Sequence, residues 1–165
     1  MSEHTFDPQQ LLSNALSATG VHIDPQDILD GLVWNISGVT PNGFPHSIFQ
    51  IVNHVIYWQD LFLSGLEATK MAGPKHAEEG WPGEKEPKSM SEWDELVERY
   101  KASLKHASTE IKSKNPLLNV PAAESTKRID ILNAYALHVS YHAGQIVLIR
   151  RVLGAWPPPG GGHTW

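Results

Sequence analysis

Two histidines four residues apart, His138 and His142, lie in an apolar stretch near the C-terminus. On a helix, residues at this spacing lie on the same face, one turn apart. The pattern His-x-x-x-His is a common way for a helix to present two imidazole ligands to one metal ion. The spacing therefore predicts either half of a metal site or two buried histidines whose ring nitrogens are hydrogen-bonded to the backbone or to water.

A third histidine, His54, shifts the balance towards a metal. In its segment the residues Ile51, His54, Trp58, Leu61 and Gly65 recur at steps of 3, 4, 3 and 4. The similar series near the C-terminus is Ile131, Tyr135, His138, His142, Gln145 and Ile149. Such spacing is typical of a helical stripe that faces the core of a bundle. We therefore expect all three histidines to point inwards.

Three buried imidazoles without an ion would leave polar ring nitrogens unpaired in a core. We therefore predict that His54, His138 and His142 bind one metal ion. Three protein ligands leave coordination positions open, which is typical of a catalytic or ligand-binding metal rather than a closed structural site. An open position can hold a water molecule and lower its pKa, or accept a substrate thiolate or oxygen. Imidazole suits zinc, nickel, copper and iron, so the pattern does not select the metal.

Other polar side chains lie near this set in the sequence. His46 lies about 12 Å along a helix from His54, so we expect it at the entrance of the site or at the start of the helix rather than among the ligands. Gln145 either orients a ligand imidazole or lies at the helix margin. His163 is in the C-terminal tail, where it folds back or stays in water. The other histidines are predicted at the surface: His4, His22, His76 and His106.

Aromatic residues offer walls for a pocket. Trp58 lies on the stripe and is expected in the core, whereas Trp81 is the one conspicuous apolar residue of a long loop. The tail from Trp156 to Trp165 is rich in proline and glycine but carries two tryptophans. Because aromatic bulk is seldom left in water, we expect this tail to pack over the bundle near the metal end.

The helices are predicted from periodicity and capping signals. A short helix is expected over residues 7–19, and a second over 25–36, with Asp24 as its N-cap and proline at its first position. A third is expected from Ser47 to Thr69, because Ser47-x-x-Gln50 fits a capping box. Residues 72–90 are predicted to form a loop, because glycine and proline recur in this segment.

Two more helices complete the set. A capping box at Ser89-x-x-Glu92 is expected to open one that ends at Asn115, and the last runs from about Ser125 to a glycine cap at Gly154. No segment alternates in the manner of a strand. The fold class predicted is therefore all-α, a four-helix bundle, with residues 1–165 forming one domain.

Composition excludes several classes of function. The chain has 165 residues, 41% of them apolar, a net charge of −5 and no cysteine. A disulfide framework, thiolate ligands and a cysteine nucleophile are thereby excluded, so any thiol must come from outside. Lysine and arginine form no patch for nucleic acid. The N-terminus lacks the order of a signal peptide, and no apolar run approaches the roughly 20 residues that span a bilayer. We expect a cytoplasmic protein.

Two motifs together resemble a known family. Residues 138–154, HVSYHAGQIVLIRRVLG, and residues 53–59, NHVIYWQ, are similar to the DinB/YfiT-like superfamily of bacterial proteins, from about residue 8 to the end of the chain. The resemblance implies an up-down-down-up four-helix bundle and a divalent ion, often nickel or zinc, held by His54, His138 and His142. It also implies a homodimer. Related proteins are metal-dependent transferases that use thiols such as bacillithiol, mycothiol or glutathione, and others are labelled metal-dependent hydrolases.

Three functions stay open. The first is a transferase that acts on a small-molecule substrate, in which the metal binds an external thiol and lowers its pKa. The second is hydrolysis, which needs a general base. Neither histidine motif contains an acid, and Asp60 and Glu67 lie off the stripe of His54. The third is a non-catalytic module that binds a ligand in a stress response.

Overall fold

The main elements of the computed structural model are four helices. The structure describes residues 6–67, 73–120 and 123–161. The helices are α1 (Pro8–Leu16), α3 (Ile48–Leu66), α4 (Met90–Ser113) and α5 (Arg128–Val152). They pack around one apolar core as a four-helix bundle, which confirms the predicted fold class. None of the helices in the described part of the chain is long and apolar enough to cross a membrane.

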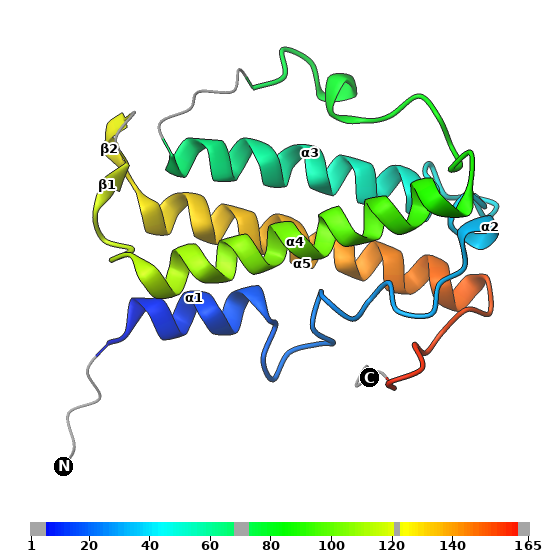
Figure 1. Ribbon diagram of the computed structural model, residues 1–165, viewed down its shortest axis with the longest axis horizontal. Coiled ribbons are helices and arrows are strands. Elements are labelled where there is room, and N and C mark those ends of the chain that lie inside the picture. Colours follow the sequence, from blue (N-terminus) through cyan, green and yellow to red (C-terminus); the bar gives the residue numbers. More distant parts are fainter. Residues whose placement is uncertain (1–5, 68–72, 121–122, 162–165) are drawn as a thin grey trace.

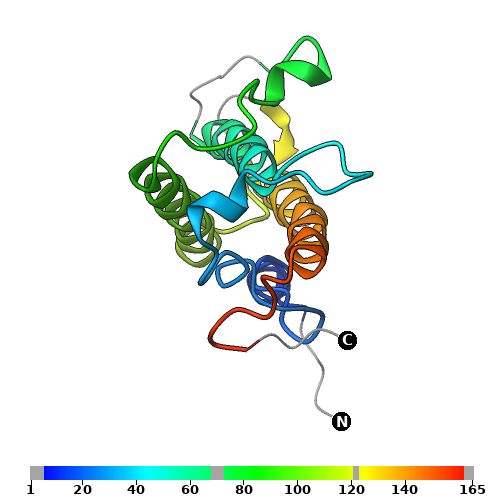
Figure 2. The same cartoon turned by 90° about the vertical axis from the view of Figure 1, so that its right-hand side faces the viewer.

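The helices connect in the up-down-down-up order that the resemblance implies. In Figure 1, α3 and α4 run in the same direction, opposite to α1 and α5. Figure 2 looks along the bundle and shows α3 beside both α4 and α5, with α1 on the far side. Two parallel neighbours need a long crossover. Residues 73–89, the described part of the crossover between α3 and α4, lie over the outer side of α3.

Much of the predicted stripe of α3 lies at the margin of the core, whereas Tyr135 and Ile149 of the α5 stripe are in the core. On α3, Trp58, Leu61 and Gly65 are only half-buried. The core face of α3 is turned away from them and is formed by Val52, Val55, Ile56, Leu63 and Leu66. Because α3 is apolar nearly all round, periodicity alone did not fix which side would be most buried. The consequence matters for function, since the stripes of α3 and α5 border the groove between these two helices.

The segment before α3 differs from the prediction. Residues 25–31 form turns instead of a helix, and only α2 (Trp34–Ser37) is helical. The Asp24 carboxylate accepts a hydrogen bond from the Gln26 backbone N–H (2.9 Å) in a local turn, and Gly31 has a φ of +69°. Three of the apolar side chains with helical spacing are still buried: Ile28, Leu29 and Leu32. Val33, with the same spacing, is exposed, and Ile36 is half-buried. The helical spacing therefore predicted neither the backbone conformation nor the burial of the whole segment.

The start of α5 also differs from the prediction. The helix begins at Arg128 rather than near Ser125, and the residues before it form a small antiparallel hairpin of β1 (Asn119–Val120) and β2 (Ala123–Lys127), which was not predicted. The buried guanidinium of Arg128 donates to the buried carboxylate of Glu110 on α4. The Asp130 side chain accepts from the Lys127 backbone N–H (3.0 Å) at the helix start. The first residue of α5 is therefore the one that forms this ion pair with α4.

Caps begin α3 and α4 as expected. The Ser47 hydroxyl accepts from the Gln50 N–H (3.2 Å) and the Gln50 side chain accepts from the Ser47 N–H (3.2 Å), which confirms the capping box. The Ser89 hydroxyl accepts from the Glu92 N–H (3.2 Å). The Glu92 carboxylate, however, accepts from the N–H of Lys88 instead of Ser89, so this second box is only half formed. The helix predicted to reach Thr69 ends at Leu66, and Thr69 lies outside the described residues.

Candidate metal centre

The three predicted ligands converge in the groove between α3 and α5. The ring centroid of His54 lies 5.3 Å from that of His138 and 4.8 Å from that of His142, and the last two are 4.5 Å apart. One ring nitrogen from each histidine lies within 4.8 Å of the others. His54 and His142 are buried, and His138 is half-buried. The structure thus brings together all three residues that the sequence singled out, in a cluster that could hold a metal ion.

Hydrogen bonds orient two of the three imidazoles. Nδ1 of His54 donates to the carbonyl oxygen of Gly80 (2.8 Å), and Nδ1 of His142 donates to Oε1 of Gln145 (2.7 Å). Because both acceptors are oxygens without a proton, Nδ1 carries the hydrogen in each ring and Nε2 keeps its lone pair. Metal-binding histidines are commonly fixed in this way by an oxygen acceptor. The contact supports the orienting role considered for Gln145.

His138 leaves a polar atom unpaired. Its Nδ1 is buried, and no hydrogen-bond partner for it is found among the described residues. A buried imidazole nitrogen without a partner costs free energy unless an ion or another group satisfies it. Together with the donor set of three imidazoles, this atom fits a divalent cation of the kind that prefers nitrogen ligands.

All three imidazoles are held in the form that binds metals. Burial, with repulsion from His142, lowers the pKa of His54 to about 4. Burial, with repulsion from His142 and His54, lowers the pKa of His138 to about 3. Burial also lowers the pKa of His142. The three rings are therefore neutral at pH 7, as metal coordination requires.

The metal-free protein is expected to lose stability as the pH falls from about 7 towards 4. In the unfolded chain these histidines titrate near 6.5, whereas His54 and His138 in the folded protein resist protonation until about pH 4 and 3. Below the unfolded pKa the unfolded chain binds protons that the folded protein does not, so the free energy of unfolding decreases. Chemical denaturation after chelator treatment, at about pH 7.5 and pH 5, measures this loss.

Two variants serve as controls for the pH experiment. His138→Ala should remove part of the pH dependence, because one of the neutral buried rings is gone. Leu137 is an exposed leucine of α5 that carries no titrating group, and Leu137→Ala should keep the dependence of the parent protein. A wild-type pH dependence in His138→Ala would contradict the assignment of the effect to the cluster.

Trp81 covers the cluster from the crossover loop. Its ring stacks on His54 with a centroid distance of 3.9 Å and an interplanar angle of 12°, and on its other side it stacks on His46 at 3.8 Å and 12°. Around the other two histidines the nearest aromatic rings are Trp58 and Phe62, near His138, and Tyr141, near His142. These rings give the cluster an apolar surround. This geometry agrees with the expectation from the sequence that Trp81 forms a wall of the site.

Three side chains of α3 hold the loop that carries Trp81. Ser47, Gln50 and His54 are spaced by three and four residues and lie on one face of the helix. The hydroxyl of Ser47 donates to the carbonyl of Lys85, the amide of Gln50 donates to the carbonyl of Pro82 (3.3 Å), and His54 donates to Gly80. The loop is therefore fixed along α3 at three points, and no local sequence pattern predicts these contacts.

The other histidines lie apart from the ligand set. His46 directly precedes the N-cap of α3, which is one of the two positions expected for it, and its buried Nδ1 has no partner among the described residues. His76 and His106 are exposed, as predicted. His22 was predicted at the surface, but it is half-buried and hydrogen-bonds to Ser140 of α5 (2.8 Å) and to the backbone of the next residue. The predictions for His4 and His163 fall outside the described residues.

The tail does not pack where it was expected. Trp156 lies against the guanidinium groups of Arg150 (5.4 Å) and Arg151 (5.9 Å), and Pro159 packs on Gly31. Arg150 is about 12 Å along α5 from His142. In Figure 2 the tail and the crossover loop lie on opposite sides of the bundle. The described part of the tail therefore covers the segment before α3, and Trp81 covers the histidines. Trp165 lies outside the described residues.

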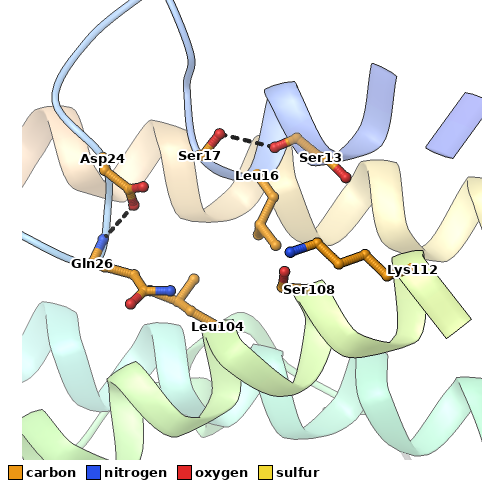
Figure 3. Close-up of a pocket in the computed structure, with 8 residues that line it drawn as sticks. All are labelled: Ser13, Leu16, Ser17, Asp24, Gln26, Leu104, Ser108 and Lys112. Carbon is orange, nitrogen blue, oxygen red and sulfur yellow. Dashed lines mark hydrogen bonds between the residues drawn. The ribbon is translucent and has the colours of Figure 1, made fainter. Parts of the chain in front are cut away.

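Two further cavities lie away from the groove between α3 and α5. One, of about 250 Å³, lies between α1 and α4 (Figure 3). Two of its polar side chains are engaged locally, since the hydroxyl of Ser17 donates to the carbonyl of Ser13 and Asp24 accepts from the Gln26 backbone. The other, of about 370 Å³, lies beyond Trp81 on the α4 side, where Arg99 pairs with Asp60. Neither is lined by a histidine of the cluster.

A family comparison supports the interpretation of this site. A model of the DinB superfamily matches residues 15–146, most of the chain. The chain belongs to the DinB superfamily. The match confirms the family that the two motifs suggested, and it covers His54, His138, His142 and Gln145. No curated protein and no solved structure matches the chain. Membership of the DinB superfamily establishes the fold, whereas the reaction must be argued from the site.

Proposed function

We propose that this DinB-superfamily protein is a metal-dependent transferase that joins a low-molecular-weight thiol to an electrophilic small molecule. His54, His138 and His142 would hold the divalent ion, nickel or zinc. The observation that carries the proposal is the convergence of three neutral imidazoles in one groove. Among the described residues no carboxylate joins this cluster, so at least one coordination position is left for a small molecule.

The chemistry needs a thiol from outside the chain. The protein has no cysteine, and a bound divalent ion would favour the deprotonated form of an external thiol. In the proposed reaction the thiol would release its proton to water, and its sulfur would form a bond to the electrophilic carbon. The bond from that carbon to the leaving group would break, and the leaving group would depart with its electron pair. The protein would hold the imidazoles in place and exclude water from the cluster. Gly80 and Gln145 fix two imidazoles, and Trp81 keeps water from one side of the cluster.

The transferase is favoured over a hydrolase by the positions of the acids. Hydrolysis needs a general base beside the site. The two acids of the α3 region that were considered, Asp60 and Glu67, are instead paired with Arg99 and His106. A non-catalytic role in ligand binding or stress response differs from both in a simple assay, because thiol and electrophile would then bind saturably without turnover.

Cobalt-loaded protein is expected to develop a sulfur-to-metal absorption band when glutathione, bacillithiol or mycothiol is added. The band should titrate with a pKa below that of the free thiol, because the ion favours the deprotonated sulfur. His54→Ala should lose the band, and His106→Ala should retain it. No spectral change with any of the three thiols would refute the transferase and leave hydrolysis or simple binding.

The remaining expectations concern the setting of the reaction. We propose a small-molecule substrate, a cytoplasmic location and a homodimer, with neither nucleic acid nor membrane as a partner. The composition supports the expectation that nucleic acid is not a partner, since the net charge is −5 and basic residues are scattered. The homodimer rests on the resemblance alone and stays a prediction.

A further inference from the structure

A small apolar cavity continues the groove between α3 and α5 beyond the histidines. Its volume is about 190 Å³. The apolar wall includes Phe44, Ile51, Leu148 and Ile149, and the polar side is formed by His46 and Gln145. Ile51 and Ile149 are buried and form the floor, whereas Leu148 is 52% exposed at the rim. The cavity therefore opens to solvent on one side and ends in the core on the other.

Of the two polar residues of the cavity, Gln145 contacts a histidine of the cluster directly and His46 is connected to it through Trp81. Gln145 accepts a hydrogen bond from His142 through Oε1, which leaves its amide N–H groups free to donate. His46 stacks on Trp81, and Trp81 stacks on His54. The buried Nδ1 of His46 has no partner in the described part of the chain. The cavity is thus lined mainly by apolar side chains, and its two polar residues are the ones that adjoin the cluster.

We propose that this cavity binds the apolar substituent of the electrophilic substrate, with the reacting carbon held towards the histidines. This inference rests on the proposed transferase. A cavity of about 150 Å³ is large enough for benzene, so the present one accommodates a single six-membered ring or a branched alkyl group of similar size. The thiols that the family resemblance implies are strongly polar. The apolar cavity therefore suits the electrophile rather than the thiol.

The size of the cavity predicts a preference among substrates. Each buried methylene contributes about fourfold in binding, so affinity should rise along a series of alkyl groups up to roughly six carbons. Beyond that size the substituent no longer fits, because closely packed walls such as Ile51 and Ile149 yield little. A hydroxyl or carbonyl next to the apolar group can be bonded by His46 or Gln145.

The experiment uses benzyl alcohol as the probe and metal-free protein labelled at isoleucine and leucine methyl groups. Titration followed by NMR should give saturable shifts at the methyls of Ile51, Ile149 and Leu148, and glycerol should give none. Leu148→Trp fills the rim of the cavity and should weaken binding at least tenfold. Leu137→Trp is the matched control, because Leu137 is an exposed leucine of the same helix that does not line the cavity.

The outcomes separate this inference from the proposed function. Absence of saturable shifts, or equal binding by Leu148→Trp and Leu137→Trp, would overturn the inference. Phe44→Ala provides a second test, since losing one apolar wall should weaken binding several-fold even if Leu148→Trp folds poorly. The measurement needs neither metal nor thiol, so failure of the cobalt experiment would leave its result unchanged.

Discussion

The substitution His142→Ala is expected to abolish stoichiometric binding of a divalent metal ion while the bundle stays folded. Groups that only orient a ligand typically contribute 10–100-fold in affinity, so loss of a ligand itself should weaken binding by more than about 100-fold. The fold should persist because the core consists of a large set of apolar side chains on all four helices. Elemental analysis of protein without a histidine tag measures the metal, and circular dichroism measures the helix content.

Two further variants make this result specific. His106→Ala should bind metal like the parent protein, since His106 is exposed and distant from the cluster in sequence and contact. Metal binding by Gln145→Ala should be weaker than that of His106→Ala and stronger than that of His142→Ala, because this change removes only the hydrogen-bond acceptor of His142. Equimolar metal in His142→Ala would show that the cluster is not the site. Unfolding of the metal-free protein would show instead that the metal is structural.

Replacement of Arg150 by methionine is expected to destabilise the protein by about 2–5 kcal/mol, because a buried carbonyl left without its donor costs about 1–3 kcal/mol and three carbonyls lose theirs. Arg150 is 1% exposed, and its guanidinium donates to the backbone carbonyls of Ile28, Asp30 (3.0 Å) and Ala155 (2.9 Å). It therefore joins the turns before α3 and the start of the tail to α5. Methionine keeps the apolar bulk but leaves three carbonyls without their donor.

The neighbouring arginine provides the control for this experiment. Arg151 is exposed and lies 5.9 Å from the Trp156 ring, so Arg151→Met should change the free energy of unfolding by less than about 1 kcal/mol. Urea denaturation of both variants gives the comparison. Equal, small effects would mean that solvent replaces the Arg150 bonds and that residues 25–31 do not depend on them.

In the turns that Arg150 holds, the spacing of apolar residues does not predict the backbone conformation. Three of the apolar residues that recur with helical spacing before α3 are buried: Ile28, Leu29 and Leu32. Their carbonyls, however, bond to Arg150 and, at Leu32, to the indole of Trp93 (3.0 Å). Spacing indicates some of the buried side chains, whereas the backbone conformation here depends on donors more than 60 residues away. No local pattern contains that information.

The sequence by itself determined the bundle and the three histidines that cluster in it. The helices are defined by apolar residues at helical spacing, by the capping box of Ser47 and by glycine and proline between the segments. Their apolar faces can be buried only against one another. His54, His138 and His142 could be found because helical spacing places them on facing stripes. These features depend on residues within a few turns of each other, and short-range geometry is what a sequence expresses directly.

Only the tertiary structure decided how the site is enclosed. It placed much of the predicted α3 stripe at the margin of the core and left a small cavity beside the histidines, lined by residues that include Ile51, Gln145 and Ile149. It placed Trp81 over the histidines instead of the tail, through hydrogen bonds from α3 to the crossover loop. It also set the start of α5 beside the buried pair of Arg128 and Glu110. Each of these depends on the relative rotation of helices far apart in the chain, which is fixed by packing of the whole core rather than by any local pattern.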